Sequence, residues 1–166
     1  MLNIYNALAK PVFQYGIIGW GAAAKTKIEK LIIVQKQIIK IILKKPKGFS
    51  TVETFQQSKL LDIPQLFIQK ALTHLHSNFT YHKNKFRSIQ GSMQVTCTRS
   101  SNKYNIQIPT RRTTIGQQHL DFIGAHIYNQ LPTDLRKTHC AFFKTALINW
   151  IINTGRVQCV KLLCLN

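Results

Sequence analysis

Side chains capable of acid–base or metal chemistry are few in this 166-residue sequence and lie far apart. The carboxylates are those of Glu29, Glu53, Asp62, Asp121 and Asp134, and no two of them are near neighbours. A two-metal polymerase or nuclease site needs clustered carboxylates to hold its cations. We therefore expect that the chain is not an enzyme on its own, with no catalytic residue, no cofactor and no small-molecule substrate.

The spacing of the cysteine and histidine residues matches no disulfide framework and no metal-binding motif. The cysteines are Cys97, Cys140, Cys159 and Cys164, without a C-x-x-C pair or a zinc spacing. Free, mostly buried thiols in a reducing compartment are the favoured interpretation, and no metal is expected. Two alternatives stay open: a metal held by Cys159, Cys164 and a histidine, and hydrolysis through the adjacent His139 and Cys140.

The charge balance is the most unusual feature of the composition. Lysine and arginine number 23 against 5 acids, for a formal charge of +18 at pH 7. Between Asp62 and Asp121 there is no acid at all, although eight basic residues lie there. So much like charge repels itself unless an anionic partner neutralises it. Nucleic acid is the commonest such partner, and an anionic membrane surface comes next.

The clearest element that could position these charges is a helix over residues 26–44. Residues that recur at three- and four-residue spacing are Ile28, Leu31, Ile32, Gln35, Ile38, Ile39 and Ile42. Broadly opposite them lie Lys30, Lys36, Gln37, Lys40 and Lys44. Thr26 and Glu29 predict a capping box at the start, and Pro46 and Gly48 end the helix. As a set, the lysines suit phosphate contact, although a solvated face is the alternative for any one of them.

The remaining pattern also predicts helices. Residues 3–20 place Ile4, Leu8, Val12, Tyr15 and Ile18 on one face, with glycines near Trp20 that permit close packing. Further helices are expected from Ile63–Pro64 to about Tyr81, over residues 116–130, and through Phe142 to Trp150 until Gly155 breaks the last one. Residues 83–116 are polar and basic, which indicates a loop or a weak hairpin that orders on nucleic acid or serves as a plain linker.

We therefore predict an all-α fold: an irregular helical bundle in two helical groups joined by a basic, loop-rich segment. The expected limits are a helical region over 1–82, the basic loop or weak hairpin over 83–116, a second helical region over 117–153 and a tail over 154–166. No signal peptide is recognisable and no run of 18 uncharged apolar residues occurs. We expect an intracellular protein, nuclear or cytoplasmic, not secreted, without a membrane span.

Several landmarks in this layout resemble the region that follows the palm of non-LTR (LINE-type, Jockey- and CR1-like) reverse transcriptases. The run Pro11-Val12-Phe13-Gln14-Tyr15-Gly16, followed by Trp20-Gly21, is similar to the family's "P-x-L-x-Y-G … W" segment. Leu31, Gln35 and Ile39-Lys40 match its "L-x-x-x-Q-x-x-x-L-R" helix, with lysine where arginine is usual.

The resemblance continues over residues 2–152 in the same order. The "T-x-x-L … L-x-I-x-x-L" stretch is matched by Thr51, Thr54-Phe55, Leu61, Ile63 and Leu66. The "Y-x-L/I … P … R" segment is matched by Tyr104-Asn105-Ile106, Pro109 and Arg111-Arg112. The "W-N-x-L-P … F-K-x-x-L" ending is matched by Tyr128-Asn129-Gln130-Leu131-Pro132 and Phe143-Lys144-Thr145-Ala146-Leu147, with tyrosine where tryptophan is usual.

This resemblance implies the thumb and adjoining C-terminal region of such an enzyme. The family's aromatic-x-Asp-Asp palm motif, which would lie upstream, does not occur in this sequence. The implied role is sequence-nonspecific binding of template–primer, as RNA, DNA or hybrid duplex, with the missing palm as a possible protein partner. The predicted nucleic-acid-binding residues are Lys30, Lys36, Lys40, Lys44, Lys83, Lys85, Arg87, Arg111 and Arg112.

Two other functions stay open. A membrane-surface protein would need the apolar face of the 26–44 helix, with Ile32, Ile39 and Ile42, to remain free for lipid. A non-functional translated relic of the element would expose Phe13, Ile17 and Trp20 and aggregate.

Overall fold

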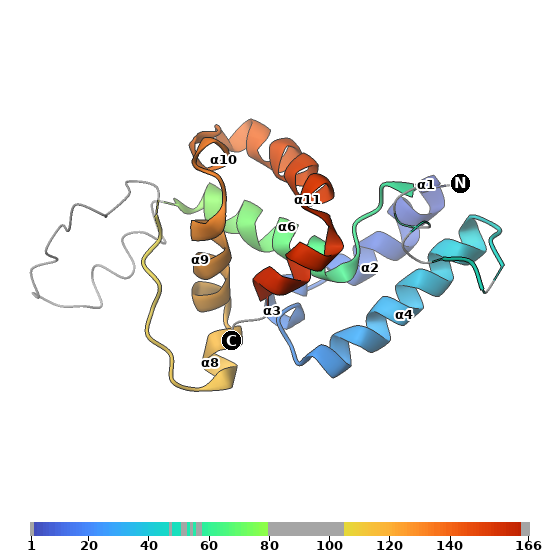
Figure 1. Cartoon of the computed structure of the whole chain (residues 1–166), viewed down its shortest axis with the longest axis horizontal. Coiled ribbons are helices and arrows are strands. Elements are labelled where there is room, and N and C mark those ends of the chain that lie inside the picture. Colours follow the sequence, from blue (N-terminus) through green and yellow to red (C-terminus); the bar gives the residue numbers. More distant parts are fainter. Residues whose placement is uncertain are drawn as a thin grey trace, which may run out of the picture. The chain divides into compact units, whose positions relative to one another are not determined.

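The computed structural model describes residues 2–46, 48–50, 53, 55, 58–79 and 105–163. Over these residues all regular structure is helical and no strand occurs, which confirms the all-α prediction (Figure 1). By contact the chain forms two compact units. Unit 1 comprises Met1–Phe67 and Ile151–Asn166, and unit 2 comprises Ile68–Trp150. The division cuts through two helices, and the domain limits expected from the sequence stay a prediction.

Unit 1 begins with four short helical turns: α1 (Leu2–Ile4), η1 (Tyr5–Ala9), α2 (Lys10–Gln14) and α3 (Ile17–Trp20). The η1 turn is π-helical and directly precedes Pro11, which lies in the first turn of α2. Proline lacks an N–H and its ring crowds the carbonyl four residues earlier, so a wider turn accommodates it.

The face that these turns bury differs from the one that spacing suggested. Tyr5, Phe13 and Ile17 are buried, whereas Ile4, Leu8, Val12 and Tyr15 are exposed and Ile18 is half-buried. The predicted apolar face is thus largely a solvent-facing stripe. Spacing grouped these residues on one side but could not show whether that side would meet the rest of unit 1, because burial depends on neighbouring segments.

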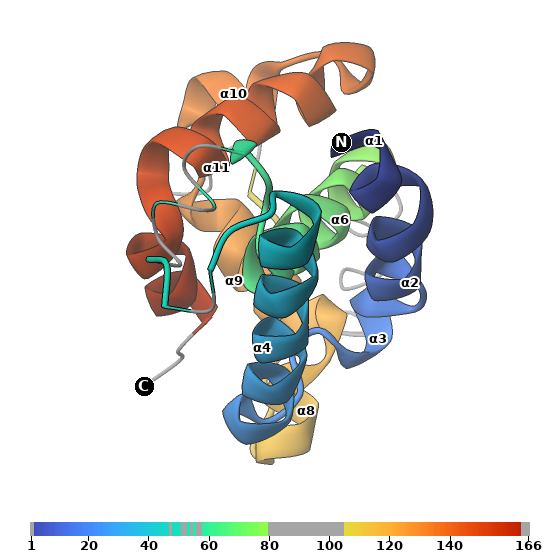
Figure 2. The ribbon, with the colours of Figure 1, turned by 90° about the vertical axis from the view of Figure 1, so that its right-hand side faces the viewer.

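The longest helix of unit 1 is α4 (Lys25–Ile42), and Figure 2 shows α1, α2 and α3 following one another along its side. Ile28, Ile32 and Ile39 are buried, as their spacing predicted. The predicted capping box is wrong: the helix begins at Lys25 after Ala24, so Thr26 already lies inside the first turn and no side chain caps it. Leu43 is the C-cap, and Lys44 follows in the left-handed region with φ of 52°.

Gln35 links α4 to two other segments of unit 1. Its Nε2 donates to the Tyr5 hydroxyl at 2.7 Å and to the Leu61 carbonyl at 3.0 Å. Its Oε1 accepts from the Ile63 N–H at 3.1 Å. The Gln35 side chain is fully buried, so these bonds satisfy an amide that would otherwise be costly to bury.

Helix α6 (Ile63–Ser77) begins where Ile63 and Pro64 predicted. Its start is held by a reciprocal pair: the Asp62 N–H donates to Gln65 Oε1 at 3.1 Å, and the Gln65 N–H donates to Asp62 Oδ1 at 3.0 Å. This is a capping box of the D-x-x-Q form, which satisfies two backbone donors of the first turn. Pro64 is tolerated there because first-turn N–H groups need no helical acceptor.

Unit 2 contains the rest of α6 with α8 (Thr114–Gln118), α9 (Leu120–Gln130), α10 (Thr133–Lys137) and the first part of α11 (Cys140–Leu163). Its buried side chains include those of Leu72, Leu75, Ile123, Ile127, Phe143 and Leu147. Residues 105–112 have no regular structure and α8 follows them, so the expected basic segment ends in a helical turn. No strand occurs in residues 105–116, and the rest of the possible hairpin lies outside the described residues.

Helix α11 ends in unit 1 after an abrupt change of direction at Gly155. This glycine has φ of 78° and ψ of 164°, a conformation open almost only to glycine. The predicted break is therefore confirmed. Helix resumes after it as far as Leu163, in the segment for which the sequence showed no pattern.

Candidate nucleic-acid interface

The fold makes the surface more basic than composition implies. Asp62 and Asp121 are only 1% and 6% exposed, so the exposed carboxylates are those of Glu29, Glu53 and Asp134. The structure describes all five acids of the chain. Among the basic residues it describes, Arg136 is also buried. Burial thus removes two of the five carboxylates from the surface. Among the lysines and arginines that the structure describes, it removes only Arg136.

The predicted lysines of α4 differ in their accessibility. Lys30 and Lys44 are exposed, whereas Lys36 and Lys40 are half-buried and have interactions of their own. Lys27, which the sequence analysis did not include, is exposed one turn before Lys30. Its three-residue spacing from Lys30 was a usable signal, because such residues are neighbours on a helix.

The solvent face of α4 is not a purely basic stripe. Ile33, Val34 and Ile41 are 52%, 45% and 75% exposed, on the same side as Lys30. The buried side holds Ile32 and Ile39, with Ile42 half-buried. Aliphatic side chains therefore lie among the exposed lysines, a combination that the predicted division into apolar and lysine faces did not include.

Arg111 and Arg112 lie in the irregular segment before α8, and both are exposed. The Arg111 carbonyl accepts from Gln117 Nε2 at 3.2 Å. Thr113 is the N-cap of α8, and its hydroxyl accepts from the Gly116 N–H at 3.2 Å. The two arginines thus precede a turn whose backbone is fixed by local hydrogen bonds.

The same segment is anchored at its other end by α9 and α10. Asn129 binds the backbone of Ile106 twice: its Oδ1 accepts from the Ile106 N–H at 2.9 Å, and its Nδ2 donates to the Ile106 carbonyl at 2.8 Å. Arg136 donates to the side chains of Asn105 and Thr133. Residues 105–113 are therefore held at both ends although they have no regular structure, and Arg111 and Arg112 project from this support.

Unit 2 contains a half-buried histidine of α6, His76, both of whose ring nitrogens are hydrogen-bonded. His76 Nε2 lies 2.8 Å from the Thr138 carbonyl and Nδ1 lies 2.9 Å from the Tyr128 hydroxyl. A carbonyl only accepts, so Nε2 carries the hydrogen and Tyr128 donates to Nδ1. The ring stacks on Phe143 with centroids 3.8 Å apart. Burial lowers the pKa of His76, and it raises the pKa of Tyr128 to about 12.

The other groups considered for chemistry are dispersed. Cys159 is buried, and burial raises the pKa of its thiol to about 11, which keeps it protonated and unreactive at neutral pH. Cys140 Sγ lies 3.9 Å from His139 Nδ1, and both residues are exposed. Within the described part of the chain no cluster of three His, Cys, Asp or Glu residues could hold a metal ion. Cys164 and Cys97 lie outside that part.

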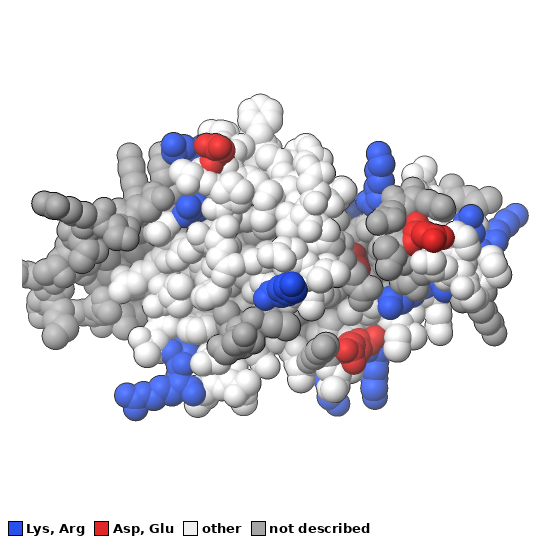
Figure 3. Space-filling model, viewed as in Figure 1, with Lys and Arg blue, Asp and Glu red and all other residues white. Residues whose placement is uncertain are grey.

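The predicted binding residues therefore fall into separate sets. Lys30, Lys36 and Lys40 belong to α4 and Lys44 follows its C-cap, all in unit 1, whereas Arg111 and Arg112 belong to unit 2. Lys83, Lys85 and Arg87 lie outside the described residues. On the face drawn in Figure 3, some described lysines and arginines project singly and others lie next to one another, with uncharged surface between these places. Each one could meet a phosphate as an individual cation.

No protein-family model, curated protein sequence or solved structure matches this chain. Among the residues that the structure describes, none of the helices combines the length and apolar character needed to cross a bilayer.

Proposed function

We propose that this chain is the thumb and adjoining C-terminal part of a non-LTR retrotransposon reverse transcriptase, without the palm active site. In this proposal it binds nucleic acid without sequence preference through its basic helical surface. The observation that carries the proposal is the charge at the surface: a chain of net charge +18 buries two of its five carboxylates. A polyanion neutralises such a surface through phosphate contacts that hold the duplex without reading its sequence.

The residues that carry the family resemblance provide further support, because several of them hold the fold together. Gln35 connects α4 to Tyr5 and to the residues on either side of Asp62. Asn129 binds Ile106 through two hydrogen bonds, although these landmarks come from different segments of the resemblance. Residue types fixed by such contacts are the ones that a shared fold would retain.

The Pro-x-x-x-Tyr-Gly landmark also has a structural reason. Gly16 has φ of 59°, in the left-handed region that favours glycine, and it begins α3. The Trp20 indole N–H then donates to the Tyr15 carbonyl at 2.7 Å. Tyr15, Gly16 and Trp20 therefore form one local turn, and their joint occurrence is more specific than that of any one of them.

The test is a salt titration of the purified chain binding to an RNA–DNA hybrid duplex, with folding checked by circular dichroism. Log Kd should rise linearly with log salt concentration, by about 0.9 per phosphate neutralised if the hybrid behaves as duplex DNA does. Lys30→Gln or Arg112→Gln should lower that slope by about 1 and weaken binding equally for unrelated sequences. Lys144→Gln, at an exposed lysine outside the predicted set, is the matched control.

Two results would count against this function. The first is a folded chain that does not bind the hybrid at low salt. The second is a salt slope that changes equally for Lys144→Gln and Lys30→Gln, since the charge would then act as a whole and not through the proposed residues.

The apolar face that membrane binding was expected to need is not free, because Ile32 and Ile39 are buried and Ile42 is half-buried. Binding to an anionic membrane surface stays a second candidate function only through the exposed Ile33, Val34 and Ile41 beside the lysines of α4. Exposed aliphatic side chains contribute nothing to phosphate contact but would insert into the interfacial region of a bilayer. Cosedimentation with phosphatidylglycerol vesicles should then decrease in Ile41→Ser, while hybrid binding stays unchanged. Equal sedimentation of both proteins would reject this candidate.

The third possibility, a relic that aggregates, rested on exposure of three side chains in residues 13–20. Phe13 and Ile17 are buried within unit 1, and Trp20 is half-buried. The exposed apolar residues of this region are instead Ile4, Leu8, Val12 and Tyr15. A monomeric, cooperatively unfolding chain would exclude the relic, and soluble aggregates dispersed by Leu8→Ser would favour it.

A further inference from the structure

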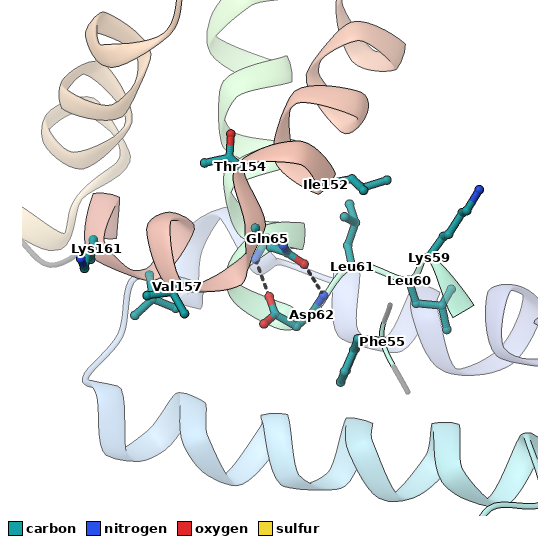
Figure 4. A pocket seen from close by; sticks show the side chains of 12 residues that line it. Phe55, Lys59, Leu60, Leu61, Asp62, Gln65, Ile152, Thr154, Val157 and Lys161 are labelled. Carbon is teal, nitrogen blue, oxygen red and sulfur yellow. Dashed lines mark hydrogen bonds between the residues drawn. The ribbon is translucent and has the colours of Figure 1, made fainter. Parts of the chain in front are cut away.

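Unit 1 contains a cavity of about 630 Å³ between the segment that leads into α6 and the C-terminal part of α11 (Figure 4). Its apolar lining comes from Phe55, Leu60, Leu61, Ile152, Val157 and Val160. Val157 is 72% exposed and Ile152 is 42% exposed, so two of the large exposed hydrophobic side chains face this one cavity. The volume lies within the range of about 300–1,000 Å³ that is common for small-molecule sites.

Two unusual backbone conformations border the cavity. Gly155, with φ of 78° and ψ of 164°, turns the chain so that Ile152 and Val157 both line it. Lys59 has φ of 51°, in the left-handed region that a residue with a side chain adopts rarely. Such conformations concentrate at binding sites, where the surrounding structure maintains them. Both residues line the cavity itself.

The polar side chains at the centre of the cavity are engaged within the protein. Asp62 and Gln65 are bonded to each other's backbone N–H groups, as the dashed lines in Figure 4 show. Cys159 Sγ lies 4.0 Å from the Ile151 carbonyl, to which the thiol donates. A ligand would meet mainly the apolar side chains that make up most of the lining. In the view of Figure 4 the lysines Lys59 and Lys161 lie at opposite ends, and both are exposed.

We propose that this cavity binds a long-chain fatty acid. The acyl chain would lie against Val157, Val160 and Phe55, where it removes apolar surface from water. The carboxylate would pair with Lys59 or Lys161 at an end of the cavity, away from the buried side chain of Asp62. A cationic ligand would meet two lysines and a strongly basic chain, so charge complementarity selects the anion.

The experiment is a titration of the whole purified chain with parinaric acid, a naturally fluorescent long-chain fatty acid, kept below micelle-forming concentrations. We expect saturable one-to-one binding that oleate displaces and that oleyl alcohol, which lacks the carboxylate, displaces poorly. Val157→Asp should weaken binding by about tenfold or more, because it places a carboxylate among the apolar lining and against the anionic ligand. Lys161→Gln should weaken it less, through the head group alone.

The matched control is Val12→Asp, the same substitution at an exposed valine of α2 that does not line the cavity. Its fatty-acid affinity should equal that of the unmodified chain. Equal losses in both aspartate variants, or no saturable binding, would overturn the proposal, since binding would then reflect general attraction to a basic protein. Displacement by oleyl alcohol as strong as by oleate would overturn the anionic assignment. Binding of phosphatidylglycerol vesicles without binding of free fatty acid would likewise reject it.

Discussion

Replacing Gln35 with leucine should lower the free energy of unfolding far more than expected from the small differences in volume and helix propensity between the two side chains. Leucine has a similar volume and a higher helix propensity, so helix formation and packing are nearly unaffected. The change removes the donor to the Leu61 carbonyl and the acceptor of the Ile63 N–H. Both backbone groups belong to buried residues, so water cannot replace the lost partner easily.

The expected magnitude follows from those two groups. A buried polar group left without its partner costs about 1–3 kcal/mol, so two of them amount to about 2–5 kcal/mol after the partial gain from burying leucine. Tyr5→Phe removes one hydroxyl and leaves the amide bonded to Leu61, so it should cost about 1 kcal/mol. In the Gln35→Leu background the same tyrosine change should cost less, because the two side chains act on one another.

The assay is urea unfolding followed by far-ultraviolet circular dichroism, with free energies compared at constant m-value. Gln37→Leu is the matched control: it makes the same substitution at an exposed position of the same helix and should stay within about 0.5 kcal/mol of the unmodified chain. If Gln35→Leu were no more destabilising than Gln37→Leu, the reasoning about the buried hydrogen bonds of Gln35 would be refuted.

Two further predictions concern pH and backbone conformation. Burial lowers the pKa of His76 in the folded chain, so the stability that neutral His76 contributes is complete above about pH 6.5 and is lost as the pH falls through the lower folded-state pKa. Urea unfolding measured from pH 7 to pH 4 should show this decrease in the free energy of unfolding. The decrease should be smaller in His76→Asn and unchanged in the control variant His74→Asn. Gly155→Ala should destabilise by about 1–3 kcal/mol, because its φ of 78° and ψ of 164° suit glycine, although an added Cβ would meet no atom within 4 Å. Gly19→Ala, inside α3, should instead be neutral or stabilising by up to about 1 kcal/mol, and equal thermal shifts for the two glycines would contradict the conformational argument.

Local rules account for the parts of the fold that were predictable. The three- and four-residue spacing in residues 28–39 selected the buried side of α4, because one helix carries that information by itself. Pro64 and Gly155 indicated where helices begin and break, since each restricts its own backbone. The box formed by Asp62 and Gln65 followed the same kind of local pattern and could have been found from its D-x-x-Q spacing.

The candidate interface was predictable only in part. Charge and spacing identified Lys30, Lys44, Arg111 and Arg112, all of which are exposed. They did not show that Lys36 and Lys40 would be half-buried, because the surroundings of a helix depend on what packs beside it. The same reason explains the exposed Ile33 and Ile41: three- and four-residue spacing groups residues by angle, but the width of the buried arc is set by neighbouring segments.

The sequence alone determined the all-α class and the strong positive charge, since composition and helical period do not depend on distant contacts. Tertiary structure decided which apolar stripe of residues 2–15 would be buried and which would face solvent. It also decided the partners of Gln35, Asn129 and His76, which lie 23 to 62 residues away along the chain. A side-chain amide or imidazole can bond many backbone groups, and only the folded chain selects which of them it meets.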